Sequence, residues 1–540
     1  MKDLVKDFIK EGYLVSPDLI KELEEEKDFD VKEFLKEFKE KVKDTPLVLN
    51  KDLYEIFKQI KEPVDMNWQE FEKTRVLKEK GKENKNYNIF LDILKKDFDN
   101  KIEIFVEEPK IEIELEENNQ ANVLVLKNYF DKNKKREVQD FINYFKIRYN
   151  FLKNILIKRQ ELQNAISINR ALNRSERETV AMIGLVNDKR TTKNGNILIT
   201  LEDPTGLINV VINKSNRELS EMANDIVLDE VIGITGYNGD RIIFVNGIFI
   251  PDVPISNEFK KSPNEEYAVF TSDLQIGNRV FFEKNFLKFI EWINGNYGSK
   301  EQRELAKKVK YLFIPGDLVE GIGVYPGQEE DLDILDIYKQ YAKLAEYLSK
   351  IRKDVKIILT AGNHDAVRLA EPQPFPDKKI AAPLYELQNT IMATNPSLVN
   401  IASTKNFPGF NVLIYHGASF FYIVENVESI RKAGRIERPD LIMKFLLQRR
   451  HLAPSHTATL YLPSPEEDPL LIEKIPDFFI SGHLHKTKVD NYHNITMMNC
   501  SSWIDQTEDQ KRRGIIPDPC KAILINLKTR EVKILNFNEI

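Results

Sequence analysis

Five short polar motifs in the C-terminal half of the chain carry side chains that could do chemistry, each directly after an apolar run. They are Thr271-Ser272-Asp273-Leu274-Gln275, Gly316-Asp317, Gly362-Asn363-His364-Asp365, His416-Gly417 and Gly482-His483-Leu484-His485. Short apolar runs bounded by Gly and Pro, such as 267–270 and 311–314, are typical of buried strands. Because ligands collect beyond the carboxyl ends of strands in α/β proteins, the motifs predict one shared site.

The residue types in these motifs suit a centre of two divalent metal ions. Two such ions, about 3.5–4 Å apart, can clamp both the attacking and the leaving oxygen of a phosphate ester. The pair needs a bridging carboxylate, neutral imidazoles and oxygen ligands, a set that fits manganese, iron or zinc better than calcium. Asp317 follows a glycine that lets the backbone approach the ions, so we predict that it bridges them.

The other ligands divide into two positions. Asn363, His416 and His483 would complete, with Asp317, what we call the second metal position. Asp273 and His485 would belong to the first metal position.

His364 and Asp365 have a different predicted role. His364 would protonate a leaving oxygen or steady the transition state, and Asp365 would fix its tautomer. A lone Gly-Asp pair is usually a turn, and a single histidine after a strand is usually a hydrogen-bonded side chain. Only seven histidines occur in 540 residues, however, and four of them lie in these motifs. The order of the motifs therefore favours a metal site.

Amphipathic patterns separate the motifs. Apolar residues recur at helical spacing after the first motif and before the third, at Phe282, Phe286, Phe289, Ile290 and Ile293, and at Tyr338, Tyr341, Leu344, Leu348 and Ile351. Strands that alternate with helices predict a layered α/β core.

The motif order resembles that of the calcineurin-like metallophosphoesterase superfamily, which includes the double-strand-break repair nucleases. More narrowly, residues 201–206, 443–456 and 462–469 resemble segments of the small subunits of archaeal family D DNA polymerases. The resemblance covers roughly residues 170–540. It implies a multidomain α/β chain with a four-layer αββα phosphoesterase core, an OB-fold barrel and a small N-terminal helical domain.

The same resemblance implies a task in DNA replication. It points to an accessory, proofreading subunit with metal-dependent 3′–5′ exonuclease activity. Two divalent ions would serve as cofactors, with manganese expected first and magnesium, iron or zinc as alternatives. The implied partners are a large catalytic subunit and DNA, with a sliding clamp as a further candidate.

Gln275 departs from the pattern of the family. Active members carry Asp-x-His in the first motif, and that histidine binds the first metal ion, whereas here the position is Gln275. An amide oxygen is a harder and weaker ligand for transition metals than imidazole. This substitution leaves open a non-catalytic scaffold subunit whose nuclease is weakened or lost. A second, separate alternative is a free-standing phosphomonoesterase.

Length and composition limit the broad class. A chain of 540 residues predicts three or four domains, and 42% hydrophobic with 30% charged residues indicates a soluble globular protein. We find no apolar run long enough to cross a membrane and no signal peptide, so we expect the cytoplasm and no membrane partner. Cys500 and Cys520 are too few for a disulfide scaffold. With net charge −6, contacts with DNA must be local.

Changes of pattern along the chain predict its domains. Residues 1–62 indicate a helical docking domain, 63–130 a flexible linker and 131–178 a helical connector. Five short strands in 179–255, separated by turn sequences, predict an oligonucleotide-binding (OB) barrel. The phosphoesterase domain would occupy 265–540.

A basic segment between the fourth and fifth motifs includes Arg449 and Arg450. It could guide a DNA strand through phosphate contacts, or it could dock a partner protein. The sequence favours neither.

Overall fold

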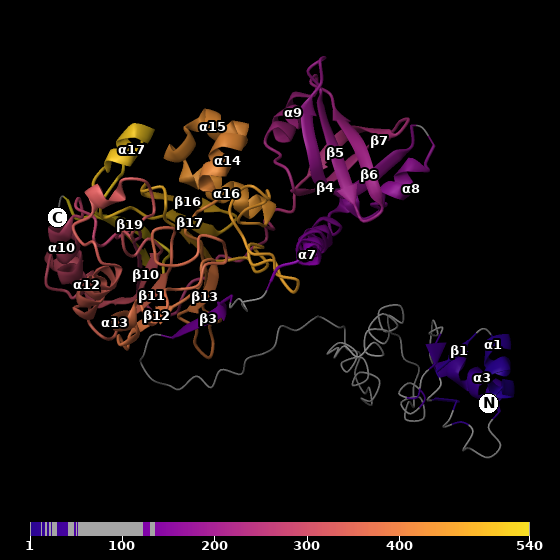
Figure 1. The fold of residues 1–540 in the computed structure, drawn as a ribbon, viewed down its shortest axis with the longest axis horizontal. Coiled ribbons are helices and arrows are strands. Elements are labelled where there is room, and N and C mark those ends of the chain that lie inside the picture. The colour runs from indigo at the N-terminus through magenta and orange to yellow at the C-terminus, as the bar shows by residue number, and fades with distance from the viewer. Residues whose placement is uncertain are drawn as a thin grey trace. The chain divides into compact units, whose positions relative to one another are not determined.

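The structure is a computed structural model that describes residues 2–11, 13–16, 19–20, 23, 30–41, 48–49, 51, 54, 122–129, 135–175 and 177–538. The chain divides into two compact units, Met1–Glu114 and Leu115–Ile540. Most of the predicted linker, 63–130, and much of the predicted N-terminal domain lie outside the described residues (Figure 1).

The described residues of the first unit include the helices α1 (Lys2–Lys10) and α3 (Val31–Lys41) and a parallel pair of strands, β1 (Leu14–Val15) and β2 (Val48–Leu49). Its aromatic side chains pack on one another, since the ring of Phe34 lies 6.2 Å from that of Phe8 and 5.4 Å from that of Tyr54. Asp30 accepts hydrogen bonds from the backbone N–H groups of Lys32 and Glu33 and so begins α3.

Six strands form the first sheet of the second unit, in the order β12-β11-β10-β9-β18-β19. They are β9 (Tyr267–Phe270), β10 (Val309–Pro315), β11 (Lys356–Thr360), β12 (Thr390–Met392), β18 (Lys521–Asn526) and β19 (Val532–Asn536). Strands β9 to β12 are parallel, and β18 is antiparallel to its neighbours. The motifs that follow β9, β10 and β11 therefore emerge at one edge of this sheet.

A second sheet has the order β16-β17-β15-β14-β13-β3. Its strands are β3 (Val123–Lys127), β13 (Ser397–Ile401), β14 (Phe410–Ile414), β15 (Phe478–Ser481), β16 (Lys488–Tyr492) and β17 (Ile495–Asn499). Because β14 and β15 are parallel, the fourth and fifth motifs also emerge together. Strand β3 comes from the range predicted as linker, so the end of that range is part of the sheet.

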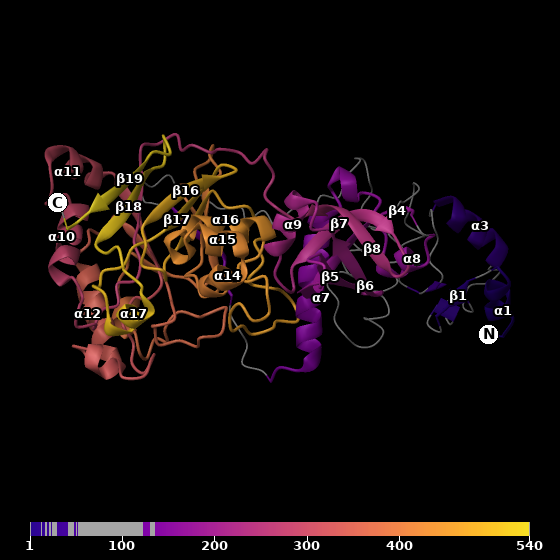
Figure 2. The same ribbon diagram turned by 90° about the horizontal axis from the view of Figure 1, so that it is seen from above.

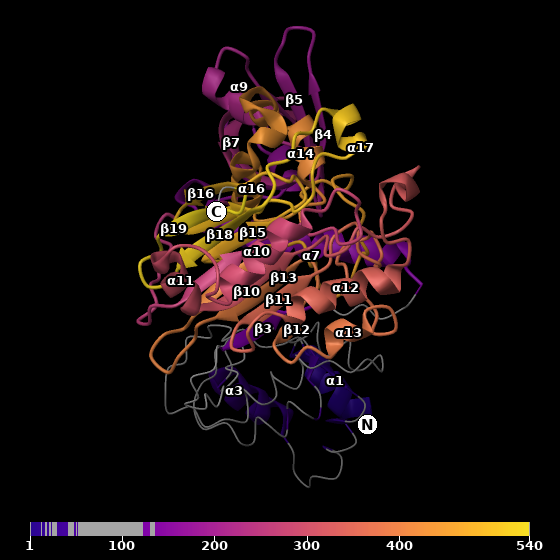
Figure 3. The same cartoon turned by 90° about the vertical axis from the view of Figure 1, so that its left-hand side faces the viewer.

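The two sheets pack face to face between helices (Figure 2). Figure 3 looks onto the helices that cover the first sheet. Phe313 of β10 shares the inner core with Val412 and Phe478, whereas Leu312 joins the outer core under the helices. The helices over the first sheet are α10 (Glu283–Ile293), α11 (Lys300–Lys307), α12 (Ile337–Ser349) and α13 (Ala382–Tyr385). Those over the second are α14 (Phe420–Asn426), α15 (Glu428–Ala433) and α16 (Pro439–Arg449). The predicted layered α/β core is confirmed.

Short helical elements lie in the loops: η2 (Gln328–Asp331), η3 (Arg435–Glu437) and α17 (Glu508–Arg513). None of the described helices has both the length and the apolar character that crossing a bilayer requires.

A five-stranded closed barrel lies in the sequence between β3 and the other strands of the two sheets (Figure 2). Its strands are β4 (Thr179–Thr191), β5 (Ile197–Asp203), β6 (Gly206–Ile212), β7 (Val231–Asn238) and β8 (Ile242–Phe249). Alternate residues such as Ile199, Leu201 and Val210 point inward and fill it. Helical elements flank it: α7 (Val138–Leu156), η1 (Gln160–Leu162), α8 (Ile168–Leu172) and α9 (Arg217–Asn224). The five strands predicted in 179–255 are confirmed.

Arg449 and Arg450 are buried, so these two members of the basic segment are not available to bind DNA or a partner, whereas Arg431, Lys432 and Arg435 are exposed and the role of the segment stays a prediction. Nε of Arg449 lies 3.2 Å from Oε2 of Glu230, which joins helix α16 to the barrel. Arg450 donates to the carbonyl oxygen of Ile472 at 2.9 Å. The two guanidinium groups bind acceptors inside the protein because the C-terminal end of helix α16 is buried.

Candidate metal centre

The five strand ends bring the motifs to one cavity of about 240 Å³. The predicted site residues in its lining are Gln275, Asp317, Asn363, His364, His483 and His485. Asp273 and His416 are fully buried, and each lies 3.3 Å from a lining residue, His485 and Asp317 respectively. Motifs spread over more than two hundred positions therefore meet in one place.

Five of the predicted ligands have a left-handed backbone. The φ angle is 50° at Asp273, 46° at Gln275, 48° at Asp317, 68° at His483 and 55° at His485. Residues other than glycine rarely adopt this region, and each such residue costs about 1–3 kcal/mol. The packing of the two sheets must hold these turns in place. Clusters of such residues are typical of functional sites.

Two motif glycines are required for space beside the carboxylates. A Cβ atom on Gly362 would collide with Asp317, and one on Gly482 would collide with Asp273. The backbone of one motif thus lies directly against the acidic side chain of another. This contact explains why both motifs begin with glycine.

The second metal position is a compact group of ligand atoms. Asp317, His416 and His483 each offer one ligand atom, and these atoms lie within 4.8 Å of one another. Nε2 of His416 is 3.3 Å from Oδ2 of Asp317 and 3.1 Å from Oδ1 of Asn363. Nδ1 of His416 is 2.8 Å from the carbonyl oxygen of Pro315, which can only accept, so Nδ1 carries a proton. In the neutral ring, Nε2 then turns its lone pair toward two oxygen atoms.

The charges at this position follow from burial and mutual contact. Burial alone would lower the pKa of His416, but the Asp317 carboxylate outweighs it and raises the pKa to about 9. Burial, together with the neighbouring His416, lowers the pKa of His483 to about 3. Although burial acts to raise it, the pKa of Asp317 is held well below its usual range by His416 and His364. At neutral pH, Asp317 is ionised and His483 is neutral, as metal ligands must be.

The first metal position is differently built. Asp273 accepts two hydrogen bonds from the backbone N–H of His483, both at 3.1 Å, and its Oδ1 lies 3.3 Å from Nε2 of His485. Within the described residues, Oε1 of Gln275 is buried and has no hydrogen-bond partner. Nδ1 of His485 lies 2.9 Å from the side-chain nitrogen of Gln510. The three predicted members are thus near the cavity, together with a glutamine that the sequence analysis did not name.

Asp365 does not contact the ring of His364, which corrects the expectation that it fixes the tautomer. Its carboxylate accepts from the backbone N–H groups of Gly362 and Leu318, at 2.8 and 3.1 Å, and from the hydroxyl of Tyr341 at 3.0 Å. Asp365 therefore ties two motif loops together. Its side chain faces the turns because their N–H groups have no other acceptor there.

Glu320 takes the place that was expected for Asp365. Nδ1 of His364 lies 3.0 Å from the carbonyl oxygen of Glu320 and 3.5 Å from its Oε1. Although burial acts to lower the pKa of His364, the Asp317 and Glu320 carboxylates raise it to about 10. The imidazole of His364 is therefore doubly protonated and positively charged at neutral pH, and it lines the cavity.

Sequence reasoning missed Glu320 and Gln510. No pattern singled out Glu320, which follows the Gly-Asp motif by three residues. A signal did exist for Gln510, because Thr507-x-x-Gln510 has the spacing of a capping box, and the structure contains that box at the start of α17.

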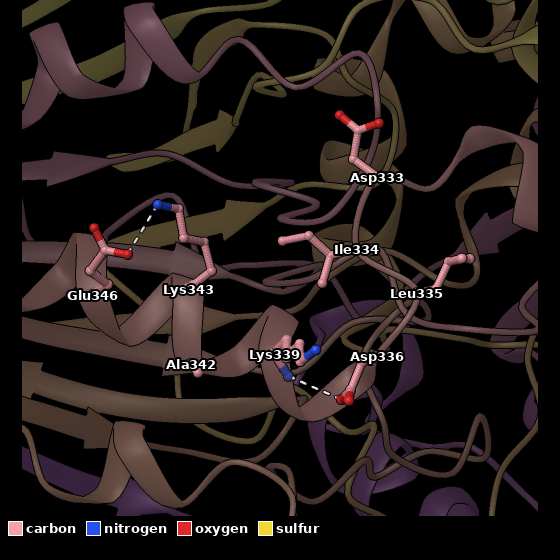
Figure 4. A pocket seen from close by; sticks show the side chains of 8 residues that line it. All are labelled: Asp333, Ile334, Leu335, Asp336, Lys339, Ala342, Lys343 and Glu346. Atoms are coloured by element: carbon pink, nitrogen blue, oxygen red, sulfur yellow. Dashed lines mark hydrogen bonds and ion pairs between the residues drawn. The ribbon is translucent and has the colours of Figure 1, made fainter.

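A second hollow, of about 580 Å³, lies along helix α12 (Figure 4). Its acidic and basic groups are engaged locally: Asp336 caps the helix through the N–H of Lys339, and Lys343 lies 3.0 Å from Glu346. None of the predicted site residues lines it. The predicted site residues therefore gather at the cavity at the strand ends and not in this hollow.

Comparisons with known proteins agree with this geometry. Residues 268–487 match the family model of the calcineurin-like phosphoesterases. The DNA polymerase II small subunit of Methanothermobacter thermautotrophicus is 41% identical over 402 residues, 74% of this chain and 80% of that protein. That of Archaeoglobus fulgidus is 39% identical over 382 residues, 71% and 74% of the two chains. That of Pyrococcus abyssi is 38% identical over 405 residues, 74% of this chain but only 63% of that protein. The chain belongs to the family of DNA polymerase II small subunits and contains a calcineurin-like phosphoesterase domain.

Proposed function

We propose that this chain is the accessory, proofreading subunit of an archaeal replicative DNA polymerase, with a metal-dependent 3′–5′ exonuclease in its phosphoesterase domain. The convergence of Asp317, His416 and His483 within 4.8 Å, in a chain whose relatives are DNA polymerase II small subunits, carries the proposal. The proposed partners are a large catalytic subunit and DNA, with a sliding clamp as a further candidate. The proposed location is the cytoplasm.

The second metal position fits a divalent cation. Nε2 of His416 faces oxygen atoms of Asp317 and Asn363, so either a proton on Nε2 or a cation that replaces this proton can lie between them. We propose that these residues and His483 would hold the ion. When bound, divalent ions polarise the phosphodiester and activate water for attack. Manganese is proposed first, with magnesium, iron and zinc as alternatives.

The first metal position would draw on Asp273, Gln275 and His485, with Asp317 shared between the two. The buried Oε1 of Gln275 has no donor among the described residues, which supports a role as a ligand. How well this position binds depends on which nitrogen of His485 carries the proton.

His364 is proposed to assist departure of the 3′ oxygen. It lines the cavity with Asn363 and Asp317, and its raised pKa keeps a proton on the ring at neutral pH. Nδ1 faces the carbonyl oxygen of Glu320, so the remaining nitrogen, Nε2, would donate that proton.

The other domains are proposed to assemble the enzyme. We propose that the barrel at 179–255 is an OB fold, that 1–62 is a helical docking domain, that 63–130 is a linker and 131–178 a connector, and that 265–540 is the phosphoesterase domain. The buried ion pair of Arg449 with Glu230 supports a fixed placement of the barrel on the phosphoesterase domain.

A scaffold subunit without nuclease activity is the second candidate. Gln275 favours it, because the first metal position lacks the imidazole that active members carry. In that case the fold would serve only assembly with the large subunit. A free-standing phosphomonoesterase is disfavoured, since the curated relatives are polymerase subunits.

An exonuclease assay with manganese distinguishes the two candidates. Digestion of a mispaired 3′ end that disappears in Asp317→Ala and rises in Gln275→His would support the enzyme. Absence of digestion in both the wild type and Gln275→His would support the scaffold subunit without nuclease activity. Lys533→Ala, on the exposed edge strand β19, is the control and should behave like the wild type. Co-purification of a much larger polymerase subunit tests the partner.

A further inference from the structure

Gln510 connects the first metal position to the start of helix α17. Its Oε1 accepts a hydrogen bond from the backbone N–H of Thr507 at 3.2 Å, and Oγ1 of Thr507 accepts one from the N–H of Gln510 at 3.3 Å. These two bonds form the capping box of α17. The other end of the same amide, Nε2, lies 2.9 Å from Nδ1 of His485.

The capping box fixes which way the Gln510 amide points. A backbone N–H can only donate, so the atom that faces Thr507 must be the amide oxygen. The NH₂ group must then face His485, and Nδ1 of His485 must accept. A neutral imidazole that accepts at Nδ1 carries its proton on Nε2. This Nε2 is the atom that lies 3.3 Å from Oδ1 of Asp273.

We propose that Gln510 holds His485 in the tautomer with the proton on Nε2, so that His485 supports Asp273 and, in a revision of the ligand set given above, does not bind an ion. The first metal position then offers only oxygen ligands, from Asp273, Gln275 and Asp317. Oxygen ligands suit a hard ion such as magnesium, and without imidazole they bind transition metals weakly. This inference rests on the proposed function and defines the metal selectivity of its site.

His416 shows the opposite arrangement in the same cavity. Its Nδ1 faces the carbonyl oxygen of Pro315, an acceptor, which keeps a proton on Nδ1 and makes Nε2 the nitrogen that can give up its proton to bind an ion. Ligand histidines in metalloproteins almost always donate their second nitrogen to an acceptor of this kind. His485 faces a donor, so one imidazole is prepared for an ion and the other is not.

The substitution Gln510→Glu replaces the NH₂ donor that faces His485 by a carboxylate oxygen, an acceptor, and keeps the helix cap. Glutamate also occupies this capping-box position, so one oxygen can still accept from Thr507. The other oxygen can accept a hydrogen bond from His485 only if Nδ1 carries the proton, so it favours the tautomer that leaves the Nε2 lone pair free. The capping box of α11 provides a matched control, because Gln302 pairs there with Ser299 in the same way. Gln302→Glu adds the same charge at the same helical position outside the cavity.

The test is to measure manganese bound by the full-length chain at equilibrium, by dialysis and metal analysis. We expect the wild type and Gln302→Glu to hold about one tightly bound ion, and Gln510→Glu to bind a second with an affinity about 10–100-fold higher than the wild type. Two equally tight ions in the wild type, or unchanged binding in Gln510→Glu, would overturn the proposal.

Nitrogen-15 spectra of the histidine rings in the metal-free wild type give a second measurement that needs no variant. The proposal requires the Nδ1 of His485 to be unprotonated, and a proton on that atom would refute it. Both measurements are independent of nuclease activity. A chain without exonuclease activity but with this tautomer would contradict the proposed function and leave the metal selectivity intact.

Discussion

His416 and His485 occupy matching places in the two halves of one cavity, each in a motif that follows a strand of the second sheet. Both imidazoles turn Nε2 toward an aspartate at 3.3 Å, Asp317 for His416 and Asp273 for His485. The atom behind each ring differs, since His416 has a carbonyl oxygen 2.8 Å from Nδ1 and His485 has an amide nitrogen at 2.9 Å. Two histidines that look equivalent in sequence therefore differ in whether Nε2 can give up its proton to an ion.

This difference shows that residue type alone does not make a ligand. The hydrogen bond on the far side of the ring decides whether the near nitrogen offers a lone pair or a proton. At His416 the group behind the ring is a backbone carbonyl, and at His485 it is the glutamine that caps helix α17.

Asp317→Ala should have the largest effect, because Asp317 belongs to both halves of the cavity. Several kcal/mol of charge stabilisation would be lost, so exonuclease activity should fall about a thousandfold and tight manganese binding should disappear. Equilibrium dialysis and the mispaired 3′ end assay measure the two effects. Retention of tight binding would show that the cavity is not the metal site.

Replacing His416 and His485 one at a time by glutamine tests whether the two histidines contribute differently to metal binding. We expect His416→Gln to lower manganese affinity by more than about 100-fold, since a prepared ligand is removed. His485→Gln should lower it by less than about tenfold, because no ligand is lost. Equal losses in the two variants would mean that the halves are equivalent.

Metal binding should depend on pH chiefly because His416, at the second metal position, must lose a proton before it can bind an ion. With the pKa of His416 raised to about 9, the free protein carries a proton there that a cation must displace. Manganese affinity should therefore fall about tenfold for each pH unit below about 9. His483, with its pKa lowered to about 3, adds nothing in this range. Titrations should show the slope in the wild type and its loss in His416→Gln.

Glu320→Gln should have the smallest effect on the rate. The carbonyl oxygen of Glu320 still accepts from Nδ1 of His364, so the ring keeps its orientation. Loss of the carboxylate charge should lower the pKa of His364 from about 10, so the alkaline limb of the pH–rate profile moves to lower pH. At neutral pH the rate should change by less than about tenfold. An unmoved alkaline limb would exclude His364 as the proton donor.

The sequence predicted the parts of the fold that depend on local pattern. Runs such as 311–314 are strands, and the motifs after them meet because parallel strands share an edge. Contacts between distant segments were not predictable in this way. Asp365 was expected beside His364 because it is adjacent in sequence, yet its carboxylate turns to Leu318 and Tyr341.

Charge pattern was the least reliable guide. Arg449 and Arg450 looked like a basic surface, but tertiary packing buries both, one of them against Glu230 from the barrel. Gln510 was hidden for a similar reason, since its cap is local whereas its contact with His485 spans 25 residues.

Strand β3 has a practical consequence for anyone who shortens this chain. Among the described strands it pairs with β13 and forms the edge of the second sheet, although it precedes the barrel in sequence. Removing every residue before α7 would leave the N–H and C=O groups of β13 open to pairing with another molecule. A truncated protein that begins at the barrel should therefore aggregate, whereas one that keeps residues 122–129 should remain in solution.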